Sequence, residues 1–215
     1  VYVVYSTSGS RVNIVGSEMH GWKGVYAYSS LYLNVDNTSF DTHYEGVQTF
    51  NTVGWVRDTT ITVDTGYAIT ISSTEWFVVE DVVTYNEGIQ ASNGEKLYLN
   101  NITVYTNAYG VKLSSMEHVV INNSNIEGVS YTSSIGVDIR SSKYVAVINS
   151  SIHGFQKGIY VSSSNAIVVN TRVYDNSWYG VYVYSLAEPG FKGYYLDIAG
   201  NGNSTTKYDR VYVED

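Results

Sequence analysis

The sequence predicts an all-β protein, a parallel β-helix in which the chain winds through three strands per coil. Two observations lead to this fold class. A glycine followed by alternating apolar residues recurs at a nearly fixed interval along the 215-residue chain, and each interval contains three apolar segments. A period of about 20 to 50 residues marks a solenoid, in which each repeat covers the apolar face of its neighbour.

The repeat is clearest in two successive segments, GVDIRSSKYVAVINSSIHGFQK at 136–157 and GIYVSSSNAIVVNTRVYDNSWY at 158–179. It is too short for helical hairpins, and the chain lacks the helical stretch and spaced leucines of leucine-rich repeats. With the glycine as origin, the intervals are 22, 20, 22, 22, 26, 22 and 22 residues, and the repeat begins at Gly24, Gly46, Gly66, Gly88, Gly110, Gly136, Gly158 and Gly180.

Each repeat contains three candidate strands. Alternation of apolar with polar or tyrosyl residues indicates a strand with one buried face. The first strand has its apolar residues one and three positions after the glycine, as in Val25/Ala27, Val111/Leu113, Val137/Ile139, Ile159/Val161 and Val181/Val183. The second has them nine and eleven positions after it, at Leu33/Val35, Leu97/Leu99, Val119/Ile121, Val145/Val147 and Ile167/Val169. The third apolar column contains Phe40, Val82, Val104, Ile152 and Tyr174. We therefore expect three sides and about eight to nine coils of about 22 residues.

Polar residues mark the corners between these strands. Asn tolerates left-handed backbone, and stacked Asn amides can bond to one another from coil to coil. One corner is indicated by Asn100/Asn101, Asn122/Asn123, Asn149 and Asn170, and another by the pairs Ser29-Ser30, Ser72-Ser73, Ser114-Ser115, Ser141-Ser142 and Ser162-Ser163.

With this repeat and these corners, residues 1–184 resemble the right-handed parallel β-helix superfamily. That superfamily includes pectate lyases, polygalacturonases and the periplasmic copper-processing β-helix proteins of nitrous-oxide reductase maturation. The resemblance implies a right-handed coil. It implies no single activity, because the repeat encodes stacking alone.

We expect one domain, since the unbroken repeat leaves no linker. Residues 1–23 are expected to form an irregular first coil, 24–184 the regular coils, and 185–215 a C-terminal strand pair or partial cap. The repeat that begins at Gly110 has four extra residues, which we place in a protruding loop between Glu127 and Ser134. The chain starts at Val1, which suggests a processed or excised segment.

Composition limits the possible partners. The net charge of −8 argues against nucleic-acid binding, which needs a basic surface. No apolar stretch is long enough for a membrane span. There are no cysteines, and the four histidines occupy different repeat positions, so we expect neither a metal nor another cofactor. The 22 tyrosines, with many Ser, Thr and Asn, are typical of extracellular or cell-surface β-proteins.

Five Asn-x-Ser/Thr motifs would permit glycosylation of an exported chain, at Asn37, Asn101, Asn122, Asn149 and Asn203. About four such motifs are expected by chance in a chain of this composition. Several also fall at the predicted Asn corner, where Asn has a structural reason to occur.

The outward positions of the first strand form the candidate ligand-binding surface. Polar groups there would bond sugar hydroxyls, and tyrosine rings would stack on sugar faces. The candidates are Tyr26, Tyr28, Gln90, Lys112, Asp138, Arg140, Tyr160 and Tyr182. The alternative without a binding function is a solvated face with a Lys112–Asp138 ion pair that contributes less than about 1 kcal/mol to the free energy of unfolding.

We expect an extracellular, non-catalytic structural or adhesive module that binds polysaccharide or assembles with itself through its coil ends into a homo-oligomer, fibre or layer. A virus spike or surface-layer component is a related alternative. The other class is a polysaccharide lyase or hydrolase. The resemblance to lyases points to Lys112, Asp138 and Arg140 as the nearest catalytic equivalents, although calcium would need more carboxylates. The Asn-x-Asp, Asp-Asp and Gly-His-Gly signatures of polygalacturonases are absent.

Overall fold

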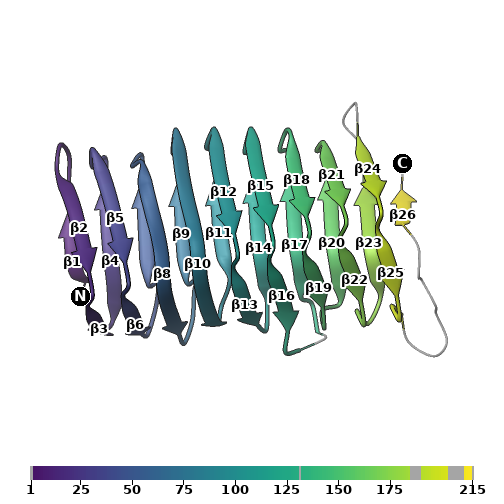
Figure 1. Ribbon diagram of the computed structural model, residues 1–215, viewed down its shortest axis with the longest axis horizontal. Helices are drawn as coiled ribbons and strands as arrows, with labels where there is room; N and C mark the ends of the chain where they lie inside the picture. The colour runs from purple at the N-terminus through teal and green to yellow at the C-terminus, as the bar shows by residue number, and fades with distance from the viewer. Residues whose placement is uncertain (1, 131, 185–189, 203–210, 215) are drawn as a thin grey trace.

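Each repeat forms one coil of a parallel β-solenoid, and successive coils stack along a straight axis (Figure 1). The computed structural model describes residues 2–130, 132–184, 190–202 and 211–214. Within these ranges every regular element is a strand, and no helix suited to crossing a membrane is found. The strands pair in parallel and in register from coil to coil, which confirms the predicted fold class.

The coil has three sides. The first side is a ten-stranded sheet of β1 (Tyr2–Ser6), β4 (Lys23–Tyr28), β7 (Val47–Phe50), β9 (Ile69–Ser72), β11 (Ile89–Ser92), β14 (Tyr109–Ser114), β17 (Ile135–Arg140), β20 (Lys157–Ser162), β23 (Tyr179–Tyr184) and β26 (Val211–Glu214). The second side contains β2 (Arg11–Val15), β5 (Tyr32–Asp36), β8 (Gly54–Val63), β10 (Trp76–Asn86), β12 (Lys96–Asn100), β15 (His118–Asn122), β18 (Val145–Ile148), β21 (Ala166–Val169) and β24 (Phe191–Tyr194). The third side contains β3 (Glu18–Gly21), β6 (Ser39–Thr42), β13 (Thr103–Thr106), β16 (Asn125–Gly128), β19 (Ser151–His153), β22 (Arg172–Tyr174) and β25 (Asp197–Ala199). The long strands β8 and β10 turn the corner and serve both the second and third sides.

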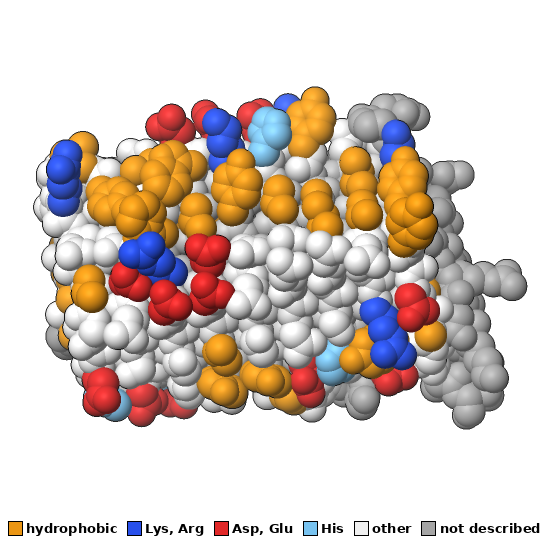
Figure 2. Space-filling model, in the orientation of Figure 1, with side chains coloured by type: hydrophobic (Ala, Val, Ile, Leu, Met, Phe, Trp, Pro, Cys, Tyr) orange, Lys and Arg blue, Asp and Glu red, His pale blue; other side chains and the backbone are white. Residues whose placement is uncertain are grey.

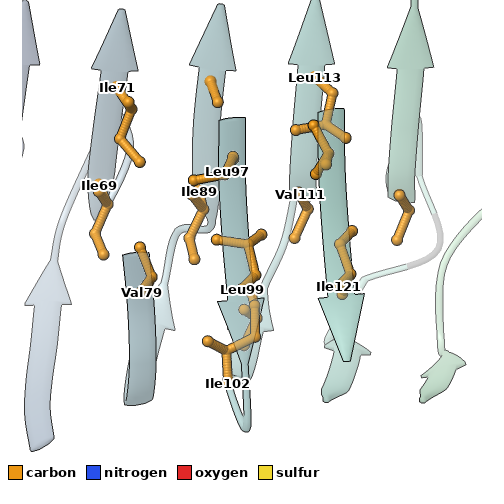
Figure 3. Close-up of a cluster of buried hydrophobic side chains, with 14 of the residues drawn as sticks. Ile69, Ile71, Val79, Ile89, Leu97, Leu99, Ile102, Val111, Leu113 and Ile121 are labelled. Carbon is orange, nitrogen blue, oxygen red and sulfur yellow. The ribbon is translucent and has the colours of Figure 1, made fainter. Parts of the chain in front are cut away.

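The core lies inside the coil as columns of aliphatic side chains, one from each coil. Figure 3 shows these side chains pointing inward from facing strands, with Ile69, Ile71 and Ile89 on one side and Leu97 and Leu99 on the other. All five are fully buried. Like residues therefore stack on like residues, and the inward column of one side packs against that of the next.

The glycine recurs because the backbone at this corner lies too close to the next coil to leave room for a side chain. A Cβ on Gly136 would lie 2.4 Å from the Ile152 Cγ2 atom and 2.6 Å from the Gly158 carbonyl oxygen. A Cβ on Gly110 or on Gly158 would lie at similar distances from the corresponding side-chain atom and glycine carbonyl. At the other repeat positions the glycine is thus a packing requirement of the corner before the first-side strand, with one exception. Before β9 the corresponding register position holds Ala68, and a Cβ on Gly66 would lie no closer than 3.6 Å to any neighbouring atom.

Both polar corners occur where they were predicted. The first corner has left-handed backbone at Ser29, Ser73, Ser115, Ser141 and Ser163. The second has it at Asn101, Asn123, Asn149 and Asn170. The Asn ladder also forms: Asn170 donates to Asn149 at 2.8 Å, Asn149 donates to Asn122 at 3.3 Å, and Asn122 donates to Asn100 at 3.0 Å.

Two details of the predicted register are wrong. In the third column, Thr84 rather than Val82 stands in line with Ile61 and Val104, and Val173 rather than Tyr174 faces the core. In the coil that begins at Gly158, Ala166 and Val168 point inward and Ile167 points outward. The connection into β21 is one residue shorter there than in the preceding coil, and a one-residue shift exchanges the two faces of a strand.

The first and last coils are more regular than the sequence suggested. Residues 1–23 were expected to be irregular, but β1, β2 and β3 form a complete coil that pairs in parallel with the second. At the other end, β24 and β25 continue the stack on β21 and β22, and β26 pairs in parallel with β23. In the described residues the C-terminal segment therefore extends the solenoid instead of forming a strand pair or cap.

The four extra residues lie where they were expected. Six residues separate Gly128 from Ile135, whereas two separate Thr106 from Tyr109 in the preceding coil. Ser134, at the end of this loop, donates a hydrogen bond of 2.7 Å to the Ser130 carbonyl.

Candidate functional site

The outer face of the ten-stranded sheet carries the predicted ligand-binding residues in two parallel columns. Strand register joins Gln90, Lys112, Asp138, Tyr160 and Tyr182 in one column that also includes Tyr26. A second column beside it joins Arg140 to Tyr28. The structure therefore brings Lys112, Asp138, Arg140, Tyr160 and Tyr182 together, whereas Tyr26 and Tyr28 lie four or more coils away.

Asp138 is not the solvated group that the sequence suggested, because its side chain is 0% exposed. The Arg140 Nε atom donates to both of its carboxylate oxygens, at 2.8 and 3.1 Å. These two residues stand two positions apart on β17 and therefore share its outer face. Asp138 lies beneath the surface and holds a partly exposed guanidinium in place above it.

Burial raises the pKa of the Asp138 carboxyl, and the nearby cations Arg140, Lys112 and Lys157 oppose this effect. The desolvation of the carboxylate is therefore larger than the attraction it gains. For Arg140, the hydrogen bond to Asp138 is the main reason that its pKa is raised. Arg140 therefore stays protonated and gives up its proton less readily than an isolated guanidinium, so it is poorly suited to act as a general base.

Tyrosine rings surround the three cations. The Arg140 guanidinium carbon lies 5.2 Å from the centroid of the Tyr160 ring. The Lys157 Nζ atom lies 5.0 Å from the same ring and 4.5 Å from the Tyr182 ring. Contacts of this kind hold flexible cationic side chains over the sheet. We call Lys112, Asp138, Arg140, Lys157, Tyr160 and Tyr182 the cationic cluster.

The residue one position before each repeat glycine also faces outward and borders the cationic cluster, which the sequence analysis did not predict. Register places Lys157 and Tyr179 in this column, and Tyr67, Glu87 and Tyr109 precede the corresponding glycine or alanine in earlier coils. The signal was present in the sequence: this position holds Tyr, Lys or Glu in every coil from Tyr2 to Tyr179 except at Ile135.

Two of these residues titrate unusually. Burial raises the pKa of Tyr67 to about 12, with smaller contributions from Tyr109, Glu87 and Asp138. Burial also raises the pKa of the Glu87 carboxyl. The Lys112 Nζ atom lies 4.7 Å from the Tyr109 ring, so this border and the cationic cluster form one surface.

The tyrosines at the N-terminal end of the sheet form a separate aromatic group. The Tyr5 and Tyr26 rings are stacked at 5.3 Å, and those of Tyr28 and Phe50 at 5.1 Å. Tyr160 and Tyr182 stack in the same way at 5.6 Å. Since neighbouring rings cover one another's faces, they present edges and hydroxyl groups to solvent. The expected stacking of sugar rings on tyrosine faces is therefore restricted to rings at the ends of each stack.

The geometry gives little support to acid–base chemistry on this face. Asp138, the predicted catalytic carboxylate, is buried and bonded to Arg140, so it does not reach a polymer lying on the sheet. Among the residues that the structure describes, no three carboxylates or histidines are grouped to hold a metal. Three histidines instead pair with carboxylates of an adjacent coil, His20 with Asp41, His43 with Asp64 and His153 with Glu127.

The glycosylation motifs occupy different environments. Asn37 and Asn101 are exposed at the Asn corner with left-handed backbone. The side chains of Asn122 and Asn149 belong to the hydrogen-bonded ladder, so a glycan there would replace a ladder contact. Asn203 lies outside the described residues.

The chain was compared with known proteins at the level of sequence and structure. Residues 83–207, more than half of the chain, match the profile of the family described as the right-handed beta helix region. No curated protein and no solved structure matches significantly. The matched region contains the cationic cluster and most of the regular coils. Together with the parallel three-sided coil, this match shows that the chain belongs to the right-handed β-helix family.

Proposed function

We propose that this chain is a non-catalytic binding module of an extracellular or cell-surface protein, and that it binds polysaccharide along the outer face of the ten-stranded sheet. One observation carries the proposal: the cationic cluster is built on a buried carboxylate. Asp138 loses hydration in order to fix Arg140, which is a cost that a purely solvated surface would not incur.

The chemistry of the cluster suits an acidic glycan. Lys112, Arg140 and Lys157 place three cations on adjacent coils, about 4.8 Å apart along the sheet. Tyrosine hydroxyls and the side chain of Gln90 offer hydrogen bonds to sugar hydroxyls on either side. A long ligand is favoured because the outward columns continue from coil to coil along the sheet.

A polysaccharide panel tests the proposal. Immobilised polyuronate, sulfated dextran and neutral dextran are probed with the wild-type chain, Arg140→Ala and Arg172→Ala, the last a surface arginine on the third side. We expect retention on the acidic polymers to fall at least about tenfold in Arg140→Ala and to persist in Arg172→Ala. Equal retention of both variants, or no retention of the wild type, contradicts the proposal.

Self-assembly through the coil ends is a second candidate. The observation in its favour is that the first coil and the last described strands have the same strand direction and the same parallel register. A second copy can therefore continue the stack. Negative-stain electron microscopy over a concentration series tests this: rods that lengthen with concentration support it, and short rods of constant length contradict it.

A further inference from the structure

An apolar row runs along the outer face of the second side, where solvent-facing residues of a strand are ordinarily polar. Figure 2 shows it as a line of hydrophobic side chains across the upper part of that face. Register identifies its members as Trp55, Val78, Tyr98, Val120, Ala146 and Ile167, one from each of six successive coils. Tyr98 is 47% and Ile167 43% exposed, and the other four are partly exposed.

The neighbouring outward positions extend this surface. The column on one side of the apolar row has Trp76 and Tyr144 at its ends, with Lys96 and His118 between them. The column on the other side is polar at Glu80, Asn100 and Asn122 and becomes apolar at Ile148 and Val169. Around Val120 and Ala146 the outward residues of β15, β18 and β21 carry no Asp, Glu, Lys or Arg. An extended uncharged face in a protein of net charge −8 marks an interaction surface.

We propose that a second copy of this chain covers the apolar row, with the two solenoids side by side and antiparallel. The two-fold axis is parallel to the strands and passes between β15 and β18. Under this operation β15 faces β18, β12 faces β21, and β10 faces β24 of the other copy. Packing two sheets face to face at about 10 Å would bury the row from Val78 to Ile167 between them, whereas Trp55 on β8 lies beyond the edge of the interface.

The facing residues are complementary in size. In this arrangement Val120 meets Ala146 and Tyr98 meets Ile167, so larger side chains oppose smaller ones. Two solenoids of the same kind also share one coil spacing, so that every row of one copy finds a row of the other. A polymer or protein with another repeat would lose this match after a few coils.

Charges on β24 and β10 select the antiparallel register. The column of the apolar row continues to Lys192 on β24, which is exposed. Glu80 lies two residues after Val78 on β10, the strand that the two-fold operation places opposite β24. No ion pair between described residues involves Lys192 or Glu80. The two-fold operation brings Lys192 of each copy over β10 of the other, within reach of Glu80, and so forms two new ion pairs.

The interface is of modest size. Six strands about 4.8 Å apart, each contributing about five residues, give a face on the order of 500 Å² on each copy. The total is near the lower limit for specific complexes, which corresponds to a weak and concentration-dependent dimer. Because the operation is a closed two-fold, assembly stops at two copies.

Sedimentation equilibrium of the 215-residue chain up to about 1 mM tests the proposal. We expect a monomer–dimer equilibrium in the wild type. In Val120→Glu the association constant should fall by at least about 100-fold, because the new carboxylate would be buried without a partner. Thr103→Glu, an outward substitution on the third side, serves as the matched control and should associate as the wild type does. A monomeric wild type over the whole range, or association that Val120→Glu leaves unchanged, would overturn the proposal.

A charge exchange tests the register without changing the apolar row. Glu80→Lys and Lys192→Glu should each weaken the dimer, and the double variant should restore it. Lys192 is exposed, and Glu80 is partly exposed with one hydrogen bond, accepted from Asn100, so neither single variant is expected to unfold the chain. This arm therefore stays decisive if Val120→Glu fails to fold. Association that is the same in all three variants contradicts the antiparallel register, and assembly beyond the dimer points to the coil ends instead.

Discussion

Individual side chains differ in stability cost according to the face of the strand on which they lie. Ile139 is fully buried, and Ile167 is 43% exposed on the outer face of the second side. We predict that Ile139→Ala lowers the free energy of unfolding by about 2–5 kcal/mol, whereas Ile167→Ala lowers it by less than about 1 kcal/mol. Urea unfolding of both variants measures the difference. Similar losses in the two variants would mean that the register of β21 is wrong.

Asp138 gives a prediction of opposite sign to that of an ordinary surface carboxylate. Its pKa is raised above the usual value of 3.8, so the folded chain binds this proton more tightly than the unfolded chain. The stability contributed by protonation is present below pH 3.8 and is lost as the pH rises through the raised pKa.

An uncharged amide at this position removes the effect. The free energy of unfolding of Asp138→Asn minus that of the wild type should therefore rise with pH across this window and become constant above it. Chemical unfolding of both proteins at a series of pH values measures this difference. A difference that falls as the pH rises would show that Arg140, Lys112 and Lys157 outweigh the desolvation of the carboxylate.

At the scale of one coil, a glycine such as Gly136 before a first-side strand is required by the distance between backbones. We predict that Gly136→Ala destabilises the chain by more than about 3 kcal/mol, because its Cβ would clash with both Ile152 and the Gly158 carbonyl. Gly21→Ala is the control, since its Cβ would meet one side-chain atom at 3.3 Å. Thermal unfolding of the two variants compares them, and a tolerated Gly136→Ala would contradict the close approach.

The Asn corner combines a left-handed backbone with the amide ladder, and two substitutions at Asn149 separate these contributions. Asn149→Gly removes the ladder contacts and keeps the backbone conformation accessible. Asn149→Ala removes the contacts and adds a backbone penalty of about 1 kcal/mol. We therefore expect unfolding free energies to fall in the order wild type, Gly variant, Ala variant. An Ala variant as stable as the Gly variant would show that the left-handed conformation is not maintained.

The sequence was sufficient to predict the coil, its three sides, both polar corners and the position of the extra loop, because each depends on a residue type that recurs at a fixed spacing. It was insufficient where a connection changes length by one residue. The segment AIVV at 166–169 is apolar at both phases, so its sequence alone does not indicate that Ile167 points outward.

The sequence predicts which residues of the candidate site lie in one column, but it does not predict their burial or their side-chain contacts. Counting from the glycine places Lys112, Asp138 and Tyr160 in line, which the register reproduces. The spacing does not indicate that Asp138 is buried or that both of its carboxylate oxygens accept from Arg140, because these depend on side-chain conformation. The coverage of ring faces by stacked tyrosines likewise depends on rotamers, which spacing does not specify.

At the scale of the whole molecule, we propose a different partner for each of two surfaces: polysaccharide on the outer face of the ten-stranded sheet, and a second copy of the chain on the apolar row. The two surfaces lie on different sides of the coil, so both partners can bind at once. The tyrosines report on each side separately, since Tyr160 and Tyr182 belong to the first, and Tyr98 and Tyr144 to the second.

Nuclear magnetic resonance of tyrosine-labelled protein, titrated with polyuronate oligosaccharides at constant protein concentration, tests the central claim most directly. Substitution of single tyrosines by phenylalanine assigns the ring signals. The account predicts that the signals of Tyr109, Tyr160 and Tyr182 shift on binding and that those of Tyr98 and Tyr144 do not. Shifts confined to Tyr98 and Tyr144, or no shift of any ring at millimolar oligosaccharide, would contradict the assignment of the ten-stranded sheet as the glycan-binding face.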